Sequence, residues 1–181
     1  DEKGASCVAE IEAAGGTAFF RRTDLTSAES IEGLCADVVE HFGRLDVLVN
    51  NAGTGDPLAI RGVEDVDAGE WNRVMMVNLT APFLIAKQAI PYMEACGGGV
   101  IIITASVAST GAGRGPFAYT CSKHGVLGLA RELSLYHGQR GIRVNAVLPG
   151  GIKTDMIAGD VDPSNPAIQK IMHMPAGRLG E

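Results

Sequence analysis

Tyr119 and Lys123 are the pair of side chains in this sequence whose types and spacing best fit proton-transfer chemistry. Residues four positions apart share one face of a helix, so a helix here would place the phenol beside the ammonium group. A free tyrosine has a pKa of about 10 and exchanges protons poorly near neutrality. A neighbouring positive charge lowers that pKa, which predicts a tyrosine that can exchange a proton with an alcohol or carbonyl oxygen. One such pair can arise by chance, so other residues must support it.

Ser106 lies thirteen residues before Tyr119, just after an apolar run typical of a buried strand. Its hydroxyl could hold a substrate oxygen beside the phenol and stabilise developing charge. The alternative is a serine that satisfies backbone groups of its own loop. Ser109 is a rival for the same role, but it lies further from the end of the strand.

Asn78 precedes Pro82 by four residues within a helical pattern. Proline has no N–H to donate and its ring crowds the carbonyl four residues back, so the Asn78 carbonyl is released from the helix. A water bound there could pass protons toward Lys123. The alternative is a proline that only kinks or starts a helix.

Helical and strand patterns alternate along the chain and indicate how these residues are positioned. The expected helices cover 5–14, 26–43, 67–95 and 117–137, and the expected strands cover 17–20, 45–49, 100–104 and 142–147. This alternation predicts an α/β fold with a doubly wound parallel sheet and helices on both faces. Ligands bind beyond the carboxyl ends of such strands, which directs attention to four places: Asp24, 50–53, Ser106 and 149–154.

Composition favours one globular domain over residues 1–181, with an irregular flap over 153–175 on the substrate side. The net charge of -6 argues against a nucleic-acid surface. The sequence has no run of about 18 apolar residues, so it predicts no membrane span. The first residues do not resemble a secretory signal. Four scattered cysteines and four histidines without ligand spacing predict reduced thiols and no metal site.

The joint occurrence of these motifs resembles the classical short-chain dehydrogenase/reductase family. The motifs in their order along the chain are Asn50-Asn51-Ala52-Gly53, Val77-Asn78-Leu79, Ser106, Tyr119-x-x-x-Lys123 and Pro149-Gly150-x-Ile152-x-Thr154. Each motif alone is weak, whereas their order and spacing together are specific. The resemblance covers essentially the whole chain.

The resemblance implies a Rossmann-like enzyme that interconverts an alcohol and a carbonyl with NAD or NADP. Tyr119 would be the general acid in reduction and the base in oxidation, and Lys123 would lower its pKa and hold the nicotinamide ribose. Ser106 would orient the substrate oxygen, and Asn78 would complete a proton relay. Further cofactor contacts would come from Asp24, Leu25, Asn51, Ala52, Gly53, Pro149, Gly150, Ile152 and Thr154.

The same resemblance implies a cytoplasmic homotetramer acting on a small molecule, with subunits paired through the helices near 72–94 and 117–137. The family's N-terminal strand with its Gly-rich turn, its second strand and its last strand are absent from the sequence. The turn binds the cofactor pyrophosphate, and the second strand carries the choice between NAD and NADP. We therefore expect a central portion of a larger enzyme that is inactive alone, whose strand over 17–20 does not neighbour the strand over 45–49.

Two alternatives remain open at this point. One is a non-catalytic, nucleotide-binding regulatory protein on the same fold, since fold does not determine function. Retention of Ser106, Tyr119, Lys123 and Asn78 argues against it. The other is the extended branch of the family, which includes sugar-nucleotide epimerases, and the Asn-Asn-Ala-Gly pattern favours the short branch instead.

Overall fold

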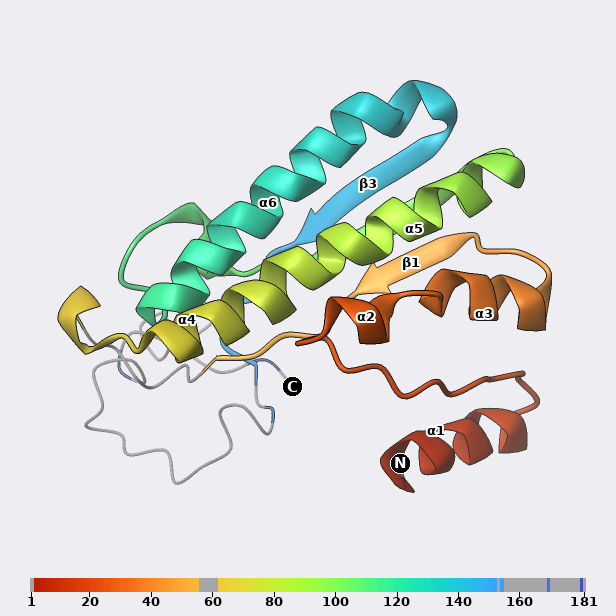
Figure 1. Cartoon of the computed structure of the whole chain (residues 1–181), viewed down its shortest axis with the longest axis horizontal. Coiled ribbons are helices and arrows are strands. Elements are labelled where there is room, and N and C mark those ends of the chain that lie inside the picture. Colours follow the sequence, from red (N-terminus) through yellow and green to blue (C-terminus); the bar gives the residue numbers. More distant parts are fainter. Residues whose placement is uncertain (1, 56–61, 153, 155–168, 170–179, 181) are drawn as a thin grey trace.

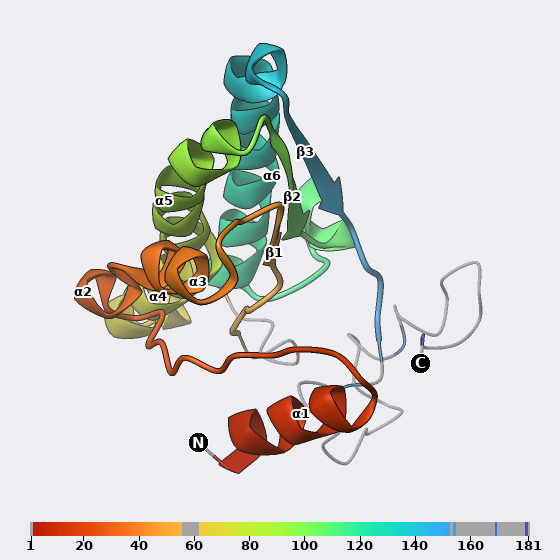
Figure 2. The same cartoon turned by 90° about the vertical axis from the view of Figure 1, so that its right-hand side faces the viewer.

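Three parallel strands form the centre of the computed structural model, which describes residues 2–55, 62–152, 154, 169 and 180. The strands lie in the order β1–β2–β3 (Figure 2), with bounds β1 Val47–Asn50, β2 Gly99–Thr104 and β3 Ile142–Val147. Figure 1 shows β1 and β3 on opposite sides of α5 in that view. Leu48 pairs with Ile101, and Ile101 pairs in turn with Val144. The strands therefore end at one edge of the sheet, where the loops that follow them can meet.

The helices that pack on the sheet cover one of its faces (Figure 2). The bounds of the helices are α1 Glu2–Ala13, α2 Ala28–Ile31, α3 Leu34–Phe42, α4 Ala68–Met75, α5 Ala81–Ala95 and α6 Phe117–His137. Shorter helical turns are η1 Val63–Asp65, η2 Met76–Thr80, η3 Val107–Thr110 and η4 Gly138–Arg140. Both α5 and α6 contact the strands, α2 and α3 pack on α5, and α4 packs on α6. No residue of α1 is buried.

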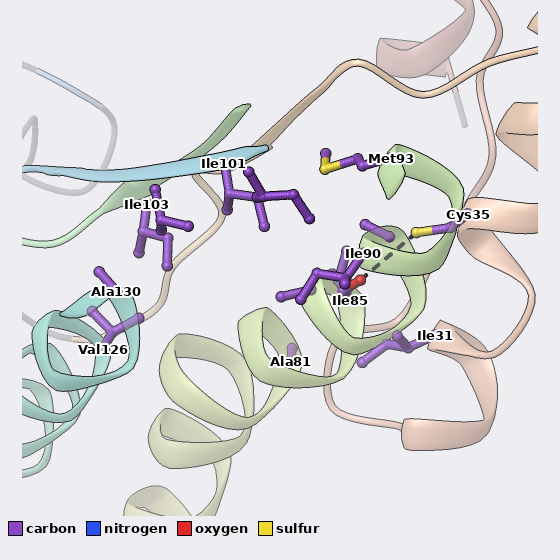
Figure 3. Packing of buried hydrophobic residues seen from close by; sticks show 14 of the residues in the cluster. Ile31, Cys35, Ala81, Ile85, Ile90, Met93, Ile101, Ile103, Val126 and Ala130 are labelled. Carbon is purple, nitrogen blue, oxygen red and sulfur yellow. Dashed lines mark hydrogen bonds between the residues drawn. The ribbon is translucent and has the colours of Figure 1, made fainter. Parts of the chain in front are cut away.

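The core lies between the sheet and these helices because alternate strand residues point toward them. Ile101 and Ile103 of β2 are fully buried and face Met93 of α5 and Val126 of α6 (Figure 3). Ile31 closes the outer side of α5, where the Gln88 amide donates to its carbonyl oxygen at 3.2 Å. This packing fixes α6, which carries Tyr119 and Lys123, and α5, whose preceding turn η2 carries Asn78, against the sheet.

The other face of the sheet is apolar and exposed in the part of the chain that the structure describes. Val47, Val49 and Val147 are each more than half exposed, although the sequence predicts strands buried on both faces. Their side chains alternate with the buried ones, as the two-residue period of a strand requires.

The strand expected at Thr17–Phe20 is not formed, and this prediction is wrong. The segment is irregular, Phe19 and Phe20 are 41% and 44% exposed, and the Phe19 ring stacks on His41 at 4.8 Å. An extended segment becomes a strand only by hydrogen bonding to a neighbouring strand, and no described residue provides one. The expectation that this segment would not neighbour the strand at 45–49 is confirmed, because β1 pairs with β2.

Two expected helices are interrupted, whereas α6 and β3 have the predicted bounds. The helix expected over 26–43 starts after the Ser27 cap and breaks before Gly33, whose φ is 77°. The helix expected over 67–95 starts after Asp67, whose carboxylate accepts from the Glu70 N–H at 2.9 Å, and widens into the π-helical turn η2. The interruptions arise from a left-handed backbone at Gly33 and from the lack of an N–H at Pro82.

One helical segment, Ala68–Ala95, is long and apolar enough to cross a membrane by length and composition alone. Core helices of soluble proteins pass the same test. The apolar residues of this segment that are buried in the protein are Val74, Val77, Ala81, Pro82, Ile85, Ala86, Ala89, Ile90 and Met93.

Candidate active site

Tyr119 and Lys123 lie one turn apart at the start of α6, and their side chains meet as predicted. The Lys123 Nζ atom lies 5.6 Å from the centroid of the Tyr119 ring. Lys123 is 4% exposed, and its Nζ donates to the Thr104 carbonyl oxygen at the end of β2, over 2.6 Å. The predicted pairing of the phenol ring with the ammonium group is therefore present in the structure.

Burial lowers the pKa of Lys123 to about 8, from an ordinary value of 10.5. Removing the ammonium from water disfavours its charged form, and the described residues place no carboxylate against it to offset that cost. Near neutral pH the side chain is still mostly protonated. The positive charge beside Tyr119 is therefore retained without a salt bridge that would neutralise it.

Asn78 lies in the π-helical turn η2 and is 2% exposed. Its carbonyl lacks the usual donor four residues on, because that residue is Pro82. Its side-chain amide grips the loop after β1, since Oδ1 accepts from the Thr54 N–H at 2.8 Å and Nδ2 donates to the Thr54 carbonyl at 2.9 Å. Asn78 thus joins a helix defect to a loop at the carboxyl end of the sheet.

Ser122 and Thr54 complete this network, and the sequence reasoning missed both. The fully buried Ser122 hydroxyl accepts from Asn78 Nδ2 at 3.0 Å and donates to the Tyr119 carbonyl at 2.8 Å. The Thr54 hydroxyl accepts from Arg73 of α4 at 2.6 Å. The position of Ser122 three residues after Tyr119 was a usable signal, since such residues share a helix face. The role of Thr54 depends on a contact 24 residues away along the chain.

The loop of Asn51, Ala52 and Gly53 passes directly over this network. A Cβ at Gly53 would lie 3.5 Å from Asn78 Oδ1 and 3.6 Å from Lys123 Nζ. Asn51 Oδ1 accepts from the Thr104 hydroxyl at 2.9 Å, on the same residue whose carbonyl holds Lys123. The structure therefore brings Asn51, Gly53, Asn78 and Lys123 together.

Ser106 begins η3, which packs against α6. The Ser106 Oγ atom accepts from the Ala108 N–H at 3.1 Å, and the Ser106 N–H donates to Ser109 Oγ at 3.2 Å. Ser106 therefore has the structural role of a cap, and no described residue accepts its hydroxyl proton, which can be donated to a substrate oxygen. Ser109 is 4% exposed and is occupied as the reciprocal cap.

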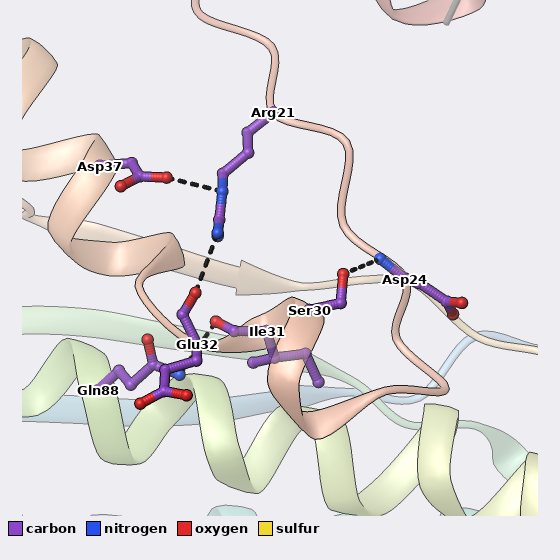
Figure 4. Close-up of polar contacts among 7 residues, drawn as sticks. All are labelled: Arg21, Asp24, Ser30, Ile31, Glu32, Asp37 and Gln88. Carbon is purple, nitrogen blue, oxygen red and sulfur yellow. Dashed lines mark hydrogen bonds and ion pairs between the residues drawn. The ribbon is translucent and has the colours of Figure 1, made fainter.

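Asp24 lies beside α2 (Figure 4), and its hydrogen bonds go to residues 26–30 rather than to this group. The Asp24 N–H donates to Ser30 Oγ at 2.8 Å, and its carboxylate points away from α2. Hydrogen bonds from the hydroxyl and N–H of Thr26 lower the pKa of the Asp24 carboxyl. Leu25 packs on the core, and the preceding segment is anchored by Arg21, whose Nε lies 2.7 Å from Asp37 Oδ2.

The loop after β3 begins next to Ser106, since the Val107 N–H donates to the Pro149 carbonyl at 3.0 Å. Further along, Ile152 forms an isolated bridge with Gly180, and the exposed Thr154 hydroxyl lies 3.5 Å from the Ile152 carbonyl. Gly150 lies between these contacts. The flap expected over 153–175 lies outside the described residues except for Thr154 and Gln169.

Replacing Asn78 with leucine removes the two hydrogen bonds between its side-chain amide and the Thr54 backbone, which we call the clamp on Thr54. The main-chain carbonyl at position 78 is kept. We expect the free energy of unfolding to fall by about 2 kcal/mol, because the Thr54 N–H and carbonyl and the Ser122 hydroxyl lose their partner. Urea denaturation measures this change. Asn72→Leu, an exposed substitution on α4, is the matched control, and equal stability of the two variants would contradict the role of the clamp.

The donors at the site suit a nucleotide sugar better than a metal. Within the described ranges no group of three or more His, Cys, Asp or Glu side chains could hold a metal ion, and all four cysteines are free. Lys123 carries three donors, of which the Thr104 carbonyl takes one. Gly53 has no Cβ, so the space beside the Lys123 ammonium that a Cβ would fill is open to a ligand hydroxyl. These residues therefore fit the ribose of a nicotinamide cofactor.

Comparison with known proteins supports this interpretation. The family model for short chain dehydrogenase matches residues 1–164. A 3beta-hydroxysteroid dehydrogenase 2 from Eggerthella lenta is 36% identical over 93% of this chain and 70% of its own length. A trans-4-hydroxycyclohexanecarboxylate dehydrogenase from Sinomonas cyclohexanicum is 44% identical over 78% of this chain and 53% of its own length.

The fold agrees with solved structures of the same family. A metagenomic short-chain oxidoreductase in complex with NADP has a TM-score of 0.76 and 35% identity, covering 84% of this chain and 68% of that one. The predicted Rossmann-like class with a parallel sheet and helices is confirmed. The chain belongs to the short-chain dehydrogenase/reductase family, whose members are oxidoreductases that use NAD or NADP.

Proposed function

We propose that this protein interconverts a secondary alcohol and the corresponding carbonyl with NAD or NADP, with Tyr119 as the general acid and base. The observation that carries the proposal is the buried Lys123 ammonium, 5.6 Å from the Tyr119 ring and next to Asn78 and Gly53. A non-catalytic protein on the same fold would not need to keep a buried charge at this cost.

When bound, the cofactor supplies the hydride in reduction and accepts it in oxidation. In reduction the Tyr119 hydroxyl donates its proton to the carbonyl oxygen of the substrate, and in oxidation the phenolate takes a proton from the alcohol. The Lys123 ammonium lowers the cost of the phenolate in both directions. Ser106 donates a hydrogen bond to the substrate oxygen, which carries developing negative charge.

A water bound at the Asn78 carbonyl oxygen would exchange protons between solvent and Lys123, so that a proton is supplied toward Tyr119 after reduction and removed after oxidation. Pro82 keeps that carbonyl free of the usual helix donor, while the clamp on Thr54 keeps the residue in place. Lys123 lies close to Asn78, since both would contact a Cβ at Gly53. The relay thus runs from Tyr119 through Lys123 to the Asn78 carbonyl.

We assign the cofactor contacts by position. Asp24 and Leu25 would contact the adenine, and Asn51, Ala52 and Gly53 would lie along the adenosine. Pro149 and Gly150 would border the nicotinamide, with Ile152 and Thr154 holding its carboxamide. Residues 51–53 follow β1 and residues 149–154 follow β3, at the carboxyl edge where such sheets bind ligands, whereas Asp24 and Leu25 belong to the segment before α2.

The substrate proposed is a ring-bearing secondary alcohol. Two relatives are named for steroid and hydroxycyclohexanecarboxylate substrates, both of which carry the alcohol on a saturated ring. The sequence suggests a partly apolar substrate, because apolar residues lie in the segment that would cover it. Those residues lie outside the described ones, and they are Met156, Ile157, Ile168 and Met172.

The test uses the protein expressed from its complete coding sequence. We expect reduced nicotinamide to form from cyclohexanol, 4-hydroxycyclohexanecarboxylate or a 3β-hydroxysteroid with NAD or NADP, followed by absorbance. The kcat/KM for the best ring alcohol should exceed that for 2-butanol by about tenfold or more, because an apolar ring fills more of a pocket. Cofactor binding without turnover of any alcohol or ketone would favour the regulatory alternative.

We also propose that the protein forms a homotetramer in the cytoplasm and binds neither nucleic acid nor membranes. Large apolar side chains on the outer surfaces of α5 and α6 support subunit contacts there, since Phe83, Leu135 and Tyr136 are 46%, 72% and 68% exposed. The net charge of -6 and the free cysteines fit this setting.

A further inference from the structure

The Tyr119 ring is flanked by two glycines that belong to different loops. A Cβ at Gly115 would lie 3.0 Å from ring atom Cδ1 and 3.6 Å from Cε1. A Cβ at Gly55 would lie 3.0 Å from Cδ2 and 3.5 Å from Cγ. Carbon atoms normally pack at about 3.5–4.0 Å. A side chain at either glycine would therefore lie too close to the ring unless the ring moved.

Packing fixes this ring, because no described residue hydrogen-bonds to the Tyr119 hydroxyl. The Lys123 ammonium attracts the ring from 5.6 Å, but such a contact does not fix the direction of the hydroxyl. The places that a Cβ would take at Gly55 and Gly115 therefore lie against opposite edges of the ring, and an added methyl group at either position would press on it.

We infer that Gly55 and Gly115 are positioning residues for Tyr119, and this inference rests on the proposed function of Tyr119 as acid and base. Gly55 follows Thr54, which Asn78 and Arg73 hold in place. Gly115 immediately precedes Pro116, whose carbonyl accepts from the Thr120 N–H in the first turn of α6. Both glycines are held in place, so their positions limit where the phenol group can lie relative to a substrate oxygen.

Gly115→Ala isolates this effect better than a change at Gly55. Gly55 has a φ of 155°, in a range that side chains rarely adopt, so a substitution there strains the backbone whatever the space. Gly115 has no such φ, and an alanine there requires the ring to move by a few tenths of an ångström. A misplacement of about 1 Å can cost about 10²-fold in rate, so we expect kcat to fall by about 3- to 10-fold.

Gly128→Ala is the matched control. It makes the same substitution in α6, and nothing lies within 4 Å of the added Cβ. We expect its kcat to stay within about twofold of the wild type. The NMR signals of the Tyr119 ring protons should shift in Gly115→Ala and stay in place in Gly128→Ala, and thermal unfolding should show both variants folded.

A double-mutant cycle with Tyr119→Phe separates this inference from the proposed function. If Gly115 acts through the phenol, Gly115→Ala should lower the residual turnover of Tyr119→Phe by less than twofold. A kcat for Gly115→Ala within twofold of the wild type, or an equal effect in both backgrounds, overturns the positioning role while the role of Tyr119 stands. Near-normal turnover of Tyr119→Phe alone removes the proposed function and the positioning role with it.

Discussion

Tyr119→Phe is expected to lower kcat by about 10²- to 10⁴-fold, the range that a positioned acid or base contributes. This corresponds to about 3–5 kcal/mol of transition-state stabilisation. Phenylalanine keeps the ring between Gly55 and Gly115 and next to Lys123, so the loss isolates the hydroxyl. Cofactor affinity should stay within about twofold, because one hydroxyl contributes little to the binding of a large nucleotide.

Steady-state kinetics together with calorimetric titration of the cofactor would measure both quantities. Tyr136→Phe is the matched control, since it removes the same hydroxyl from the same helix at a position that is 68% exposed. We expect that variant to retain wild-type kcat. Turnover of Tyr119→Phe within tenfold of the wild type would contradict the assignment of Tyr119 as the acid and base.

Lys123→Met should reveal the energetic cost of keeping a charge buried beside Tyr119. The pKa of Lys123 is about 8 in the folded protein against 10.5 ordinarily, a difference worth about 3 kcal/mol. Below pH 8 both folded and unfolded states are protonated, and the burial penalty acts in full. Between pH 8 and 10.5 the unfolded state binds more protons, so stability rises with pH.

The expected result is therefore a difference in the free energy of unfolding between the wild type and Lys123→Met that changes with pH. Relative to Lys123→Met, the wild-type free energy of unfolding should increase by about 3 kcal/mol from neutral pH to about pH 10.5. Urea denaturation at several pH values measures it, and subtracting the variant removes contributions of other titrating groups. Lys87→Met, on the exposed side of α5, should show no such trend. A flat difference for Lys123→Met would mean that the ammonium is not buried in solution.

Local pattern was enough to predict much of the framework of the site. The bounds of α6 and β3 agree with the predicted ones, because α6 combines a broad apolar face with flanking Pro116 and Gly138 and β3 is a compact run with β-branched residues. The meeting of Tyr119 with Lys123 follows from helical spacing alone. The release of the Asn78 carbonyl follows from the covalent structure of Pro82, and the π-helical turn agrees with it.

Local pattern failed where a residue depends on partners distant in the sequence. The segment at Thr17–Phe20 has strand-forming residues, but a strand needs a hydrogen-bonded neighbour, and no described residue provides one. For Ser106 the sequence left a catalytic role and a role within its own loop open, and the contacts with Ala108 and Ser109 show that it caps η3. Ser122 and Thr54 carry no catalytic signature, and they matter because both contact the Asn78 amide.

The sequence by itself determined the family, the reaction class and the four residues proposed for catalysis, because the type, order and spacing of its motifs along the chain suffice for the resemblance. Only the tertiary structure decided how those side chains are held. Burial of Lys123 against Thr104 sets its pKa, and Gly55 and Gly115 enclose the Tyr119 ring. These properties arise from contacts between segments far apart along the chain, and desolvation and close packing exist only once the segments meet.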